Sequence, residues 1–303
     1  ERAALRDWLC GRRAAADRAT GFAWSTALGG LEAALDDLCA RHAGVPLADW
    51  LGAGAPERVQ LYANLNRTWG DHALGDLVTA ARTAAAEGFP AVKIAPFDAG
   101  GDGATEIVTA GLAVVDAVLA VLPDRTALMI DCHFRLDDRA LLTALPELAA
   151  RRAFWVEDAV DPHDLDRLRW LRDRTSVPLA AGEHEWDPAV VEAACATGAV
   201  DFWLVDPKHA GGPRATRRLL GLTGDATVSY HNPSGPVGTV HAAQLSGLSP
   251  RLTWLEYAWG EPDRVDHLSP AEKVENGALV VPPGPGVGVG LAAADGGEPV
   301  VSR

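Results

Sequence analysis

Short apolar runs alternate with amphipathic stretches along most of the chain. Eight runs of β-branched or other apolar residues cover 58–65, 90–97, 127–134, 154–160, 178–183, 201–208, 227–232 and 253–259. The segments between them, such as LVTAARTAAAEG and IVTAGLAVVDAVLAVL, have the spacing of helices. This alternation predicts parallel strands joined by crossover helices. Eight such units, with no G-x-G-x-x-G after a strand, favour a closed α/β (β/α)₈ TIM barrel over an open doubly wound sheet.

The two ends of the chain depart from this alternation. Residues 1–55 have a helical pattern in which Leu28, Leu31, Leu35 and Leu38 predict one apolar face, and the helix is expected to end near Gly44-Val-Pro46. From about residue 260 the chain is rich in Pro and Gly (VVPPGPGVGVG) and is expected to run back over another domain. We therefore divide the chain into a helical region (1–55), a barrel (56–259) and a returning segment (260–303).

Composition narrows the class of protein. The 303 residues are 48% hydrophobic and 22% charged, enough for a full core, and the net charge of −14 argues against a nucleic-acid binder. No apolar run of about 18 residues predicts a membrane span, and the first residues lack the apolar core of a signal peptide. They also lack an initiating Met, so we expect the true N-terminus to be missing. The four widely spaced cysteines are typical of reduced thiols in a cytoplasmic protein (Cys10, Cys39, Cys132 and Cys195).

Six consecutive runs each carry a polar residue near their end. These residues follow one another at intervals of 26, 26, 23, 25 and 25 positions (Asp131, Glu157, Glu183, Asp206, His231 and Glu256). One βα unit corresponds to one interval, so each unit brings a charged or imidazole side chain to the barrel mouth, where barrel active sites lie. A single strand-end carboxylate is usually a helix cap or an ion-pair partner. Six such residues at the same place in six consecutive βα units indicate a functional site.

The first three of these residues have the chemistry of a metal site. Asp131, Glu157 and Glu183 could not all stay ionised at one point without a cation. Their oxygen ligands suit a hard ion, Mg²⁺ in particular. Zinc is the alternative, because His133 lies two residues after Asp131 and His184 directly follows Glu183.

At these residues the chain resembles the enolase superfamily, in its mandelate racemase/muconate lactonizing enzyme-like branch. The resemblance runs from about Gly21 to the end of the chain. It rests on an ordered set of motifs: Lys93 in AVKIAPF, Asp131 in MIDCHF, Glu157 in WVEDAV, Glu183 in AAGEHEW, Asp206 in VDPKHAGG, His231 in YHNPSG and Glu256 in WLEYAW. Any one motif is weak, but the ordered set is specific.

The resemblance implies a fold and a set of roles. The fold would be a modified, enolase-like barrel with a partial N-terminal α+β capping domain, of which the helices and the C-terminal return are visible here. Asp131, Glu157 and Glu183 would ligate Mg²⁺, while Asp206 and His231 would form an acid–base dyad. Glu256 would hydrogen-bond the substrate carboxylate.

Two departures from the racemase pattern bear on the reaction. The racemases carry K-x-K on the second strand, whereas this chain has Ala95 at the position of the second lysine. The third strand carries Asp131-x-His133, which resembles the acid-sugar dehydratases of the galactonate and mannonate type, where this histidine is a general acid. Strand alternation would put His133 on the interior face with Asp131 and turn Cys132 toward the helices.

These groups suit removal of a proton next to a carboxylate. Mg²⁺ and a cationic Lys93 would stabilise the developing charge, and His231, oriented by Asp206, would take the proton. His133 would protonate a departing β-hydroxyl, so that a hydroxy-acid loses water and gives a 2-keto acid. Lys208, two residues after Asp206, is either a substrate contact or a charge partner. We expect His209, His163 and His241 at the surface or on helices.

Other readings stay open. One is a racemase or epimerase with Lys93 and His231 as bases on opposite faces of the substrate. Another is a dehydratase of a cyclic hydroxy-amino acid such as hydroxyproline, and a third is a binding protein that kept the ligand set. In each enzyme reading the partner is a small carboxylate, with no nucleic acid or membrane, and we expect a homo-oligomer.

Overall fold

The computed structural model describes residues 17–54, 56–68, 73–98, 100, 103–261 and 268–292. Within these ranges it confirms the predicted barrel. Eight parallel strands follow one another around it, and β1 pairs with β8 to close it. They are β1 (Arg58–Asn64), β2 (Ala91–Ile94), β3 (Ala127–Asp131), β4 (Val156–Glu157), β5 (Leu179–Ala181), β6 (Phe202–Val205), β7 (Thr227–Tyr230) and β8 (Leu252–Ala258). All eight predicted runs contain a strand, although most strands are shorter than the runs.

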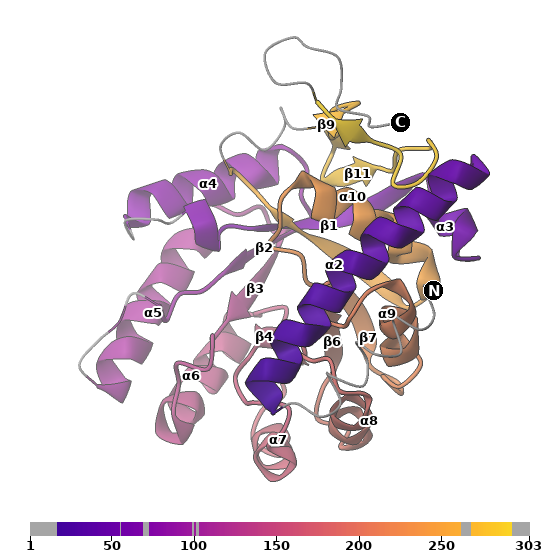
Figure 1. Cartoon of the computed structure of the whole chain (residues 1–303). Coiled ribbons are helices and arrows are strands. Elements are labelled where there is room, and N and C mark those ends of the chain that lie inside the picture. Colours follow the sequence, from indigo (N-terminus) through magenta and orange to yellow (C-terminus); the bar gives the residue numbers. More distant parts are fainter. Residues whose placement is uncertain are drawn as a thin grey trace.

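Helices surround the strands on the outside of the barrel (Figure 1). They are α4 (Leu74–Ala86), α5 (Ala104–Leu119), α6 (Asp138–Ala150), α7 (Leu165–Arg172), α8 (Pro188–Ala196), α9 (Pro213–Leu220) and α10 (Pro236–Leu245), with short 3₁₀ turns η1 (Asn66–Thr68) and η2 (Ser246–Leu248). The side chains of Asp137, Asp164 and Asp187 cap the start of α6, α7 and α8 by accepting backbone N–H groups. These helix starts lie just after the strand ends, so the caps help to fix the turns at the barrel mouth.

Two apolar layers hold the barrel together. One cluster fills the interior with Tyr62, Ala91, Met129, Trp155, Ala180 and Leu204. A larger cluster lies between strands and helices, and it contains the buried Cys132, as strand alternation predicts. The interior positions continue toward the carboxyl ends of the strands as Lys93, Asp131 and Glu157, which are at most 1% exposed. The site is therefore built directly on a packed hydrophobic layer.

The N-terminal region forms a long helix and a short one. Helix α2 (Arg18–Ala43) starts at Asp17, whose side chain accepts the N–H of Thr20, and ends at Gly44 in the left-handed conformation (φ 71°). Helix α3 (Leu47–Trp50) follows. The predicted helix end is confirmed, whereas residues 1–16 of the predicted helical region lie outside the described residues.

The predicted leucine face of α2 is wrong. Only Leu28 of the four is buried, while Leu31 and Leu38 are 38% and 62% exposed. Apart from Leu28, the buried face carries small and acidic residues, namely Gly21, Ser25, Gly29, Glu32, Asp36 and Ala40. It packs against polar turns of the barrel: a Cβ on Gly29 would lie 2.1 Å from the carbonyl oxygen of Lys208. A larger side chain at residue 29 would therefore push the helix away from the barrel.

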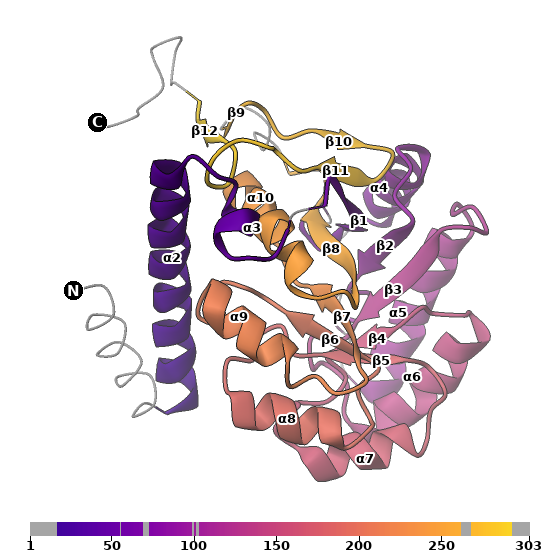
Figure 2. The same ribbon diagram turned by 90° about the vertical axis from the view of Figure 1, so that its right-hand side faces the viewer.

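An ion pair fixes α2 to the barrel. The fully buried carboxylate of Asp36 accepts hydrogen bonds from both terminal nitrogens of Arg214 in α9, at 2.8 and 3.1 Å. It also accepts the indole N–H of Trp50 at 3.1 Å. The helix is thus held across the carboxyl ends of the strands, alongside α9 (Figure 2).

The C-terminal segment returns to both the barrel and α2. It contains β9 (Leu268–Ser269), β10 (Val274–Glu275), β11 (Ala278–Val280) and β12 (Gly290–Leu291). Strand β11 pairs antiparallel with β1, and the N–H of Val287 donates to Asp37 of α2 at 2.7 Å. Figure 2 shows this segment above the barrel, beside the end of α2. The domain boundaries near residues 55 and 260 stay a prediction.

Two expectations from composition can be compared with the described residues. Cys39, Cys132 and Cys195 have free thiols, and Cys10 lies outside the described residues. In the described part of the chain, no helix combines the length and the apolar character that crossing a bilayer requires.

Candidate active site

Three carboxylates meet at the barrel mouth. Asp131 and Glu157 end β3 and β4 and are register partners, and Glu183 follows two residues after β5. One oxygen from each lies within 4.8 Å of the others. The three residues are 1%, 0% and 7% exposed. They can therefore hold one divalent cation between them.

The chemistry of the group fits such a cation. Burial raises the pKa of Glu157 well above its usual range, and it does the same for the adjacent Asp158, whose Oδ2 is buried without a hydrogen-bond partner. Adjacent anions cost free energy when they are withdrawn from water unless a cation neutralises them. An oxygen-only set of ligands suits a hard divalent ion.

Lys93 supplies a buried positive charge on β2. Its Nζ lies 2.7 Å from Glu157 Oε1, 3.0 Å from Glu256 Oε1 and 3.7 Å from Asp131 Oδ2. Burial opposes the charge, but the carboxylates of Glu157 and Glu256 hold the pKa of Lys93 well above its ordinary value. The ammonium thus forms ion pairs with these carboxylates in the barrel interior, beneath the mouth.

Glu256 on β8 is fully buried, and both of its carboxylate oxygens accept hydrogen bonds. Its Oε1 accepts from Asn64 and Lys93, and its Oε2 accepts the N–H of Asn232 at 2.8 Å. Burial alone would raise the pKa of Glu256, but the charges of Lys93 and His231 lower it. Its ionised carboxylate therefore orients Lys93 and the turn after β7.

The structure brings His231 and Asp206 into contact. His231 Nδ1 lies 3.0 Å from Asp206 Oδ2, and the other ring nitrogen, Nε2, lies 3.0 Å from Glu183 Oε2. Lys208 Nζ donates to the same Asp206 oxygen at 2.6 Å, so Lys208 is a charge partner of this carboxylate. Burial would raise the pKa of Asp206, but the hydrogen bond from His231 and the charge of Lys208 lower it. The ionised Asp206 fixes the orientation of the imidazole and leaves Nε2 facing the carboxylate triad.

His133 reaches the triad from another side. Its Nε2 lies 2.9 Å from Asp131 Oδ2, and its Nδ1 lies 2.7 Å from Asp98 Oδ2. Strand alternation does not place it there, because β3 ends at Asp131 and His133 lies in a turn with φ 43°. Burial would lower the pKa of His133, but Asp131 and Asp98 raise it to about 9. The imidazole is therefore held protonated between two carboxylates.

Further histidines line the mouth beneath α2. The rings of His184, His209 and His231 lie 6.0–6.4 Å apart, and Phe22 of α2 contacts the first two. The surface or helix position expected for His209 is wrong: its side chain is 18% exposed, and Nδ1 lies 3.0 Å from Thr26 Oγ1 of α2. His241 lies on α10 as expected but is buried, and His163 lies exposed in the turn after β4. Helix α2 thus forms one wall of the site.

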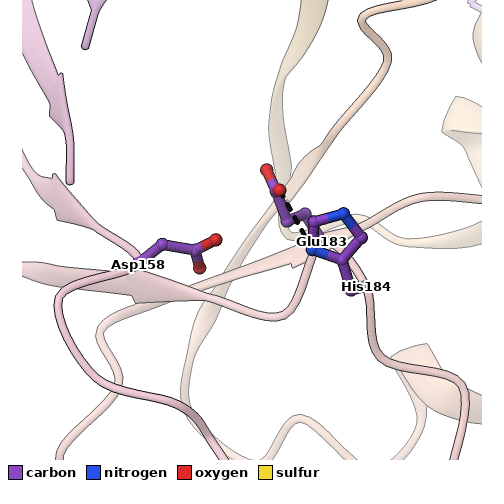
Figure 3. Close-up of side chains that lie close together, drawn as sticks. All are labelled: Asp158, Glu183 and His184. Atoms are coloured by element: carbon purple, nitrogen blue, oxygen red, sulfur yellow. Dashed lines mark ion pairs between the residues drawn. The ribbon is translucent and has the colours of Figure 1, made fainter. Parts of the chain in front are cut away.

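Sequence reasoning missed two acidic residues. Asp98 follows β2 and binds His133, and Asp158 follows Glu157 directly and faces Glu183 and His184 (Figure 3). Asp158 has an available signal, since an acidic residue directly beside a predicted ligand is a natural candidate for the same site. Asp98 has no such signal, because its partner lies 35 residues further along the chain.

The fold and this geometry together define a class of protein. A (β/α)₈ barrel carries, at the carboxyl ends of its strands, a carboxylate triad between two imidazoles. The family model described as "Enolase C-terminal domain-like" matches residues 76–295, and the chain belongs to this family. The resemblance to the enolase superfamily is thereby confirmed.

Curated relatives include several named acid-sugar dehydratases. D-gluconate dehydratase of Thermoproteus tenax is 29% identical over 277 residues, which are 89% of this chain and 55% of that protein. D-xylonate dehydratase of Haloferax volcanii is 26% identical over 88% of this chain and 67% of its own. The chain thus spans between about half and two thirds of the length of these relatives.

Solved structures agree on the fold. A mandelate racemase/muconate lactonizing enzyme-like protein from Rubrobacter xylanophilus superposes with a TM-score of 0.80 at 28% identity. The match covers 89% of this chain and 75% of that protein.

Proposed function

We propose that the chain is a Mg²⁺-dependent hydro-lyase that dehydrates a sugar acid to a 2-keto-3-deoxy acid. The observation that carries the proposal is that two imidazoles contact the same carboxylate triad. His231 Nε2 lies 3.0 Å from Glu183, and His133 Nε2 lies 2.9 Å from Asp131. A substrate bound at the triad therefore meets two separate groups able to transfer protons. The names of the curated relatives support an acid sugar as the substrate class.

Asp131, Glu157 and Glu183 would hold the Mg²⁺. When bound, this ion supplies electrostatic stabilisation for the charge that develops on the substrate carboxylate as the C2 proton leaves. Lys93 and Glu256 balance charge in the interior beside the triad: the Lys93 ammonium compensates the buried carboxylate of Glu157 at 2.7 Å and that of Glu256 at 3.0 Å.

His231 acts as the base. Its Nδ1 is held by Asp206 at 3.0 Å, and its Nε2, which lies 3.0 Å from Glu183, is the nitrogen directed at the triad and would accept the C2 proton. Lys208 donates to the same Asp206 oxygen and helps to keep that carboxylate ionised. The dyad is well ordered because the imidazole and Asp206 are both buried and lie at the ends of adjacent strands.

His133 acts as the acid. It donates its proton to the C3 hydroxyl as the C3–O bond breaks, and water leaves. The electrons of the C2–H bond form the C2–C3 double bond, and the resulting enol becomes the 2-keto acid. One proton is taken from C2 and one is delivered to the hydroxyl, so the reaction releases water and needs no redox partner.

The position of Lys93 favours dehydration over racemisation. A racemase requires a second base on the opposite face of the substrate, but Lys93 is 1% exposed and paired with three carboxylates. Ala95 cannot transfer a proton. A cyclic hydroxy-amino acid is the alternative substrate, and the cytoplasmic location and homo-oligomeric state stay predictions.

The proposal is tested with a panel of acid sugars. The purified chain with Mg²⁺ is incubated with D-gluconate, D-xylonate, D-galactonate, D-mannonate and 4-hydroxyproline, and 2-keto acid is measured. Keto acid from one or more sugar acids, lost on chelation and restored by Mg²⁺, is the expected result. Interconversion of C2 epimers without keto acid would establish the racemase, and keto acid from hydroxyproline alone would establish the cyclic substrate.

A further inference from the structure

A second group of potential metal ligands adjoins the carboxylate triad. Asp158, Glu183 and His184 each offer one ligand atom, and these atoms lie within 4.8 Å of one another. Figure 3 shows the Asp158 carboxylate directed toward the other two side chains, from the turn after β4. Glu183 belongs to both groups, whereas Asp158 and His184 belong only to this one.

Asp158 points to a missing ligand. The residue is 1% exposed, and its Oδ2 has no hydrogen-bond partner. A buried, unpaired carboxylate oxygen is costly unless a proton or a cation neutralises it. Among the described residues, Lys93 is the ammonium buried near the triad, and its contacts are with Glu157, Glu256 and Asp131. In the described part of the chain Lys93 and His133 face Glu157, Glu256, Asp131 and Asp98 and form no ion pair with Asp158, so an ion held by the triad alone leaves Asp158 without a cation of its own.

The spacing of the group suits coordination. Metal–ligand bonds of about 2.1 Å put two ligand atoms about 3 to 4.2 Å apart on one ion. Glu183 Oε1 and His184 Nδ1 are 3.1 Å apart, as neighbouring ligands are, and Glu183 Oε2 faces His231 instead. The side chain of His184 is 53% exposed, so an ion can enter from that side and retain water ligands.

We propose that Asp158, Glu183 and His184 bind a second divalent cation, a transition metal such as Mn²⁺ or Zn²⁺, next to the Asp131–Glu157–Glu183 site. The imidazole nitrogen distinguishes this group from the oxygen-only triad and favours a transition metal over Mg²⁺. Glu183 then bridges the two ions. Two ions sharing a carboxylate typically lie about 3.5–4 Å apart, which is close enough for magnetic coupling.

The test counts bound Mn²⁺. The full chain is stripped with a chelator and titrated with Mn²⁺, and free Mn²⁺ is followed by its electron paramagnetic resonance signal. Wild type should bind two Mn²⁺ per chain and give a coupled two-ion spectrum. Asp158→Asn and His184→Gln should each bind one Mn²⁺ and give an uncoupled spectrum. Excess Mg²⁺ should displace the first Mn²⁺ more readily than the second.

Matched controls separate the site from general effects of charge. Asp166→Asn removes a fully exposed carboxylate, and His42→Gln removes an exposed imidazole, so both should still bind two ions. Circular dichroism checks that each variant is folded, and His184→Gln keeps the test decisive if Asp158→Asn does not fold. One Mn²⁺ per wild-type chain, or two in His184→Gln, would overturn the proposal. Because no substrate is present, the count is independent of the proposed dehydratase activity.

Discussion

Replacement of His133 by Asn separates the two proton transfers of the proposed reaction. The variant keeps a short polar side chain in the turn with φ 43°, a conformation that Asn tolerates well. It removes the imidazole that lies 2.9 Å from Asp131 and 2.7 Å from Asp98. Loss of a general acid typically costs about 10²- to 10⁴-fold in rate, so elimination should fall by that factor.

The proposed base, His231, should keep its function in this variant. His231 follows β7 and is held by Asp206 at 3.0 Å, whereas His133 follows β3, so removal of the C2 proton should continue. In D₂O the variant should therefore return substrate that carries deuterium at C2 while forming little keto acid. Proton exchange is measured by NMR, and keto acid is measured in the same sample.

Asp98→Asn gives a graded comparison. It weakens the 2.7 Å contact to His133 Nδ1 but leaves the imidazole in place. A hydrogen bond to a charged group contributes about 1.5–3 kcal/mol, which sets an upper limit of about 10- to 100-fold on the loss of elimination. If His133→Asn eliminates water at the wild-type rate, His133 is not the acid. If it loses exchange and elimination together, the two steps do not belong to separate histidines.

Three other perturbations test the metal site, a buried histidine and the docking of α2. Glu157→Gln should lower Mg²⁺ affinity in calorimetry by at least about 100-fold and abolish Mg²⁺-dependent turnover, with an unchanged circular dichroism spectrum. Burial lowers the pKa of His241 from 6.5 to about 4. Between these two pH values His241 is protonated in the unfolded chain and neutral in the folded chain. The contribution of neutral His241 to the free energy of unfolding should be fully present above pH 6.5 and should fall by up to about 3 kcal/mol toward pH 4. In urea denaturation, His241→Gln should lack this dependence on pH. Asp36→Ala should cost about 2 kcal/mol in the same assay and expose α2 to protease, because it leaves Arg214 without its buried carboxylate; unchanged cleavage would show that this pair does not hold the helix.

The strand-borne part of the site is predictable because the barrel repeats. Each βα unit returns the chain to the same end of the barrel, so a polar residue at the end of successive runs must lie near its neighbours. Asp131, Glu157, Asp206, His231 and Glu256 follow this rule, at or directly after the last residue of a strand or within it. The period of the sequence therefore predicts that Asp131 lies beside Glu157 and Asp206 beside His231, whereas Glu183 lies in the turn two residues after β5.

The buried face of α2 is not predictable in the same way. A leucine pattern normally marks the face that packs on a core. Here the helix lies on the polar turns of the barrel mouth, and its buried Asp36 pairs with Arg214, which is 178 residues away in the chain. Local periodicity contains no information about such a partner.

The turns determine what the triad can do. Asp158 and His133 both have positive φ, which redirects the chain directly after β4 and β3 and turns their side chains to positions that strand alternation does not give. The carboxylates and Lys93 on the strands form a charged layer at the base of the site. Such a layer suits any reaction in which a carboxylate substrate loses a neighbouring proton. The turns that follow the strands bring two further pairs to the site, His133 with Asp98 and Asp158 with His184. In the proposed reaction, the choice between returning a proton to C2 and expelling a hydroxyl therefore depends on residues outside the strands, and changes in those turns should alter the reaction without altering the barrel.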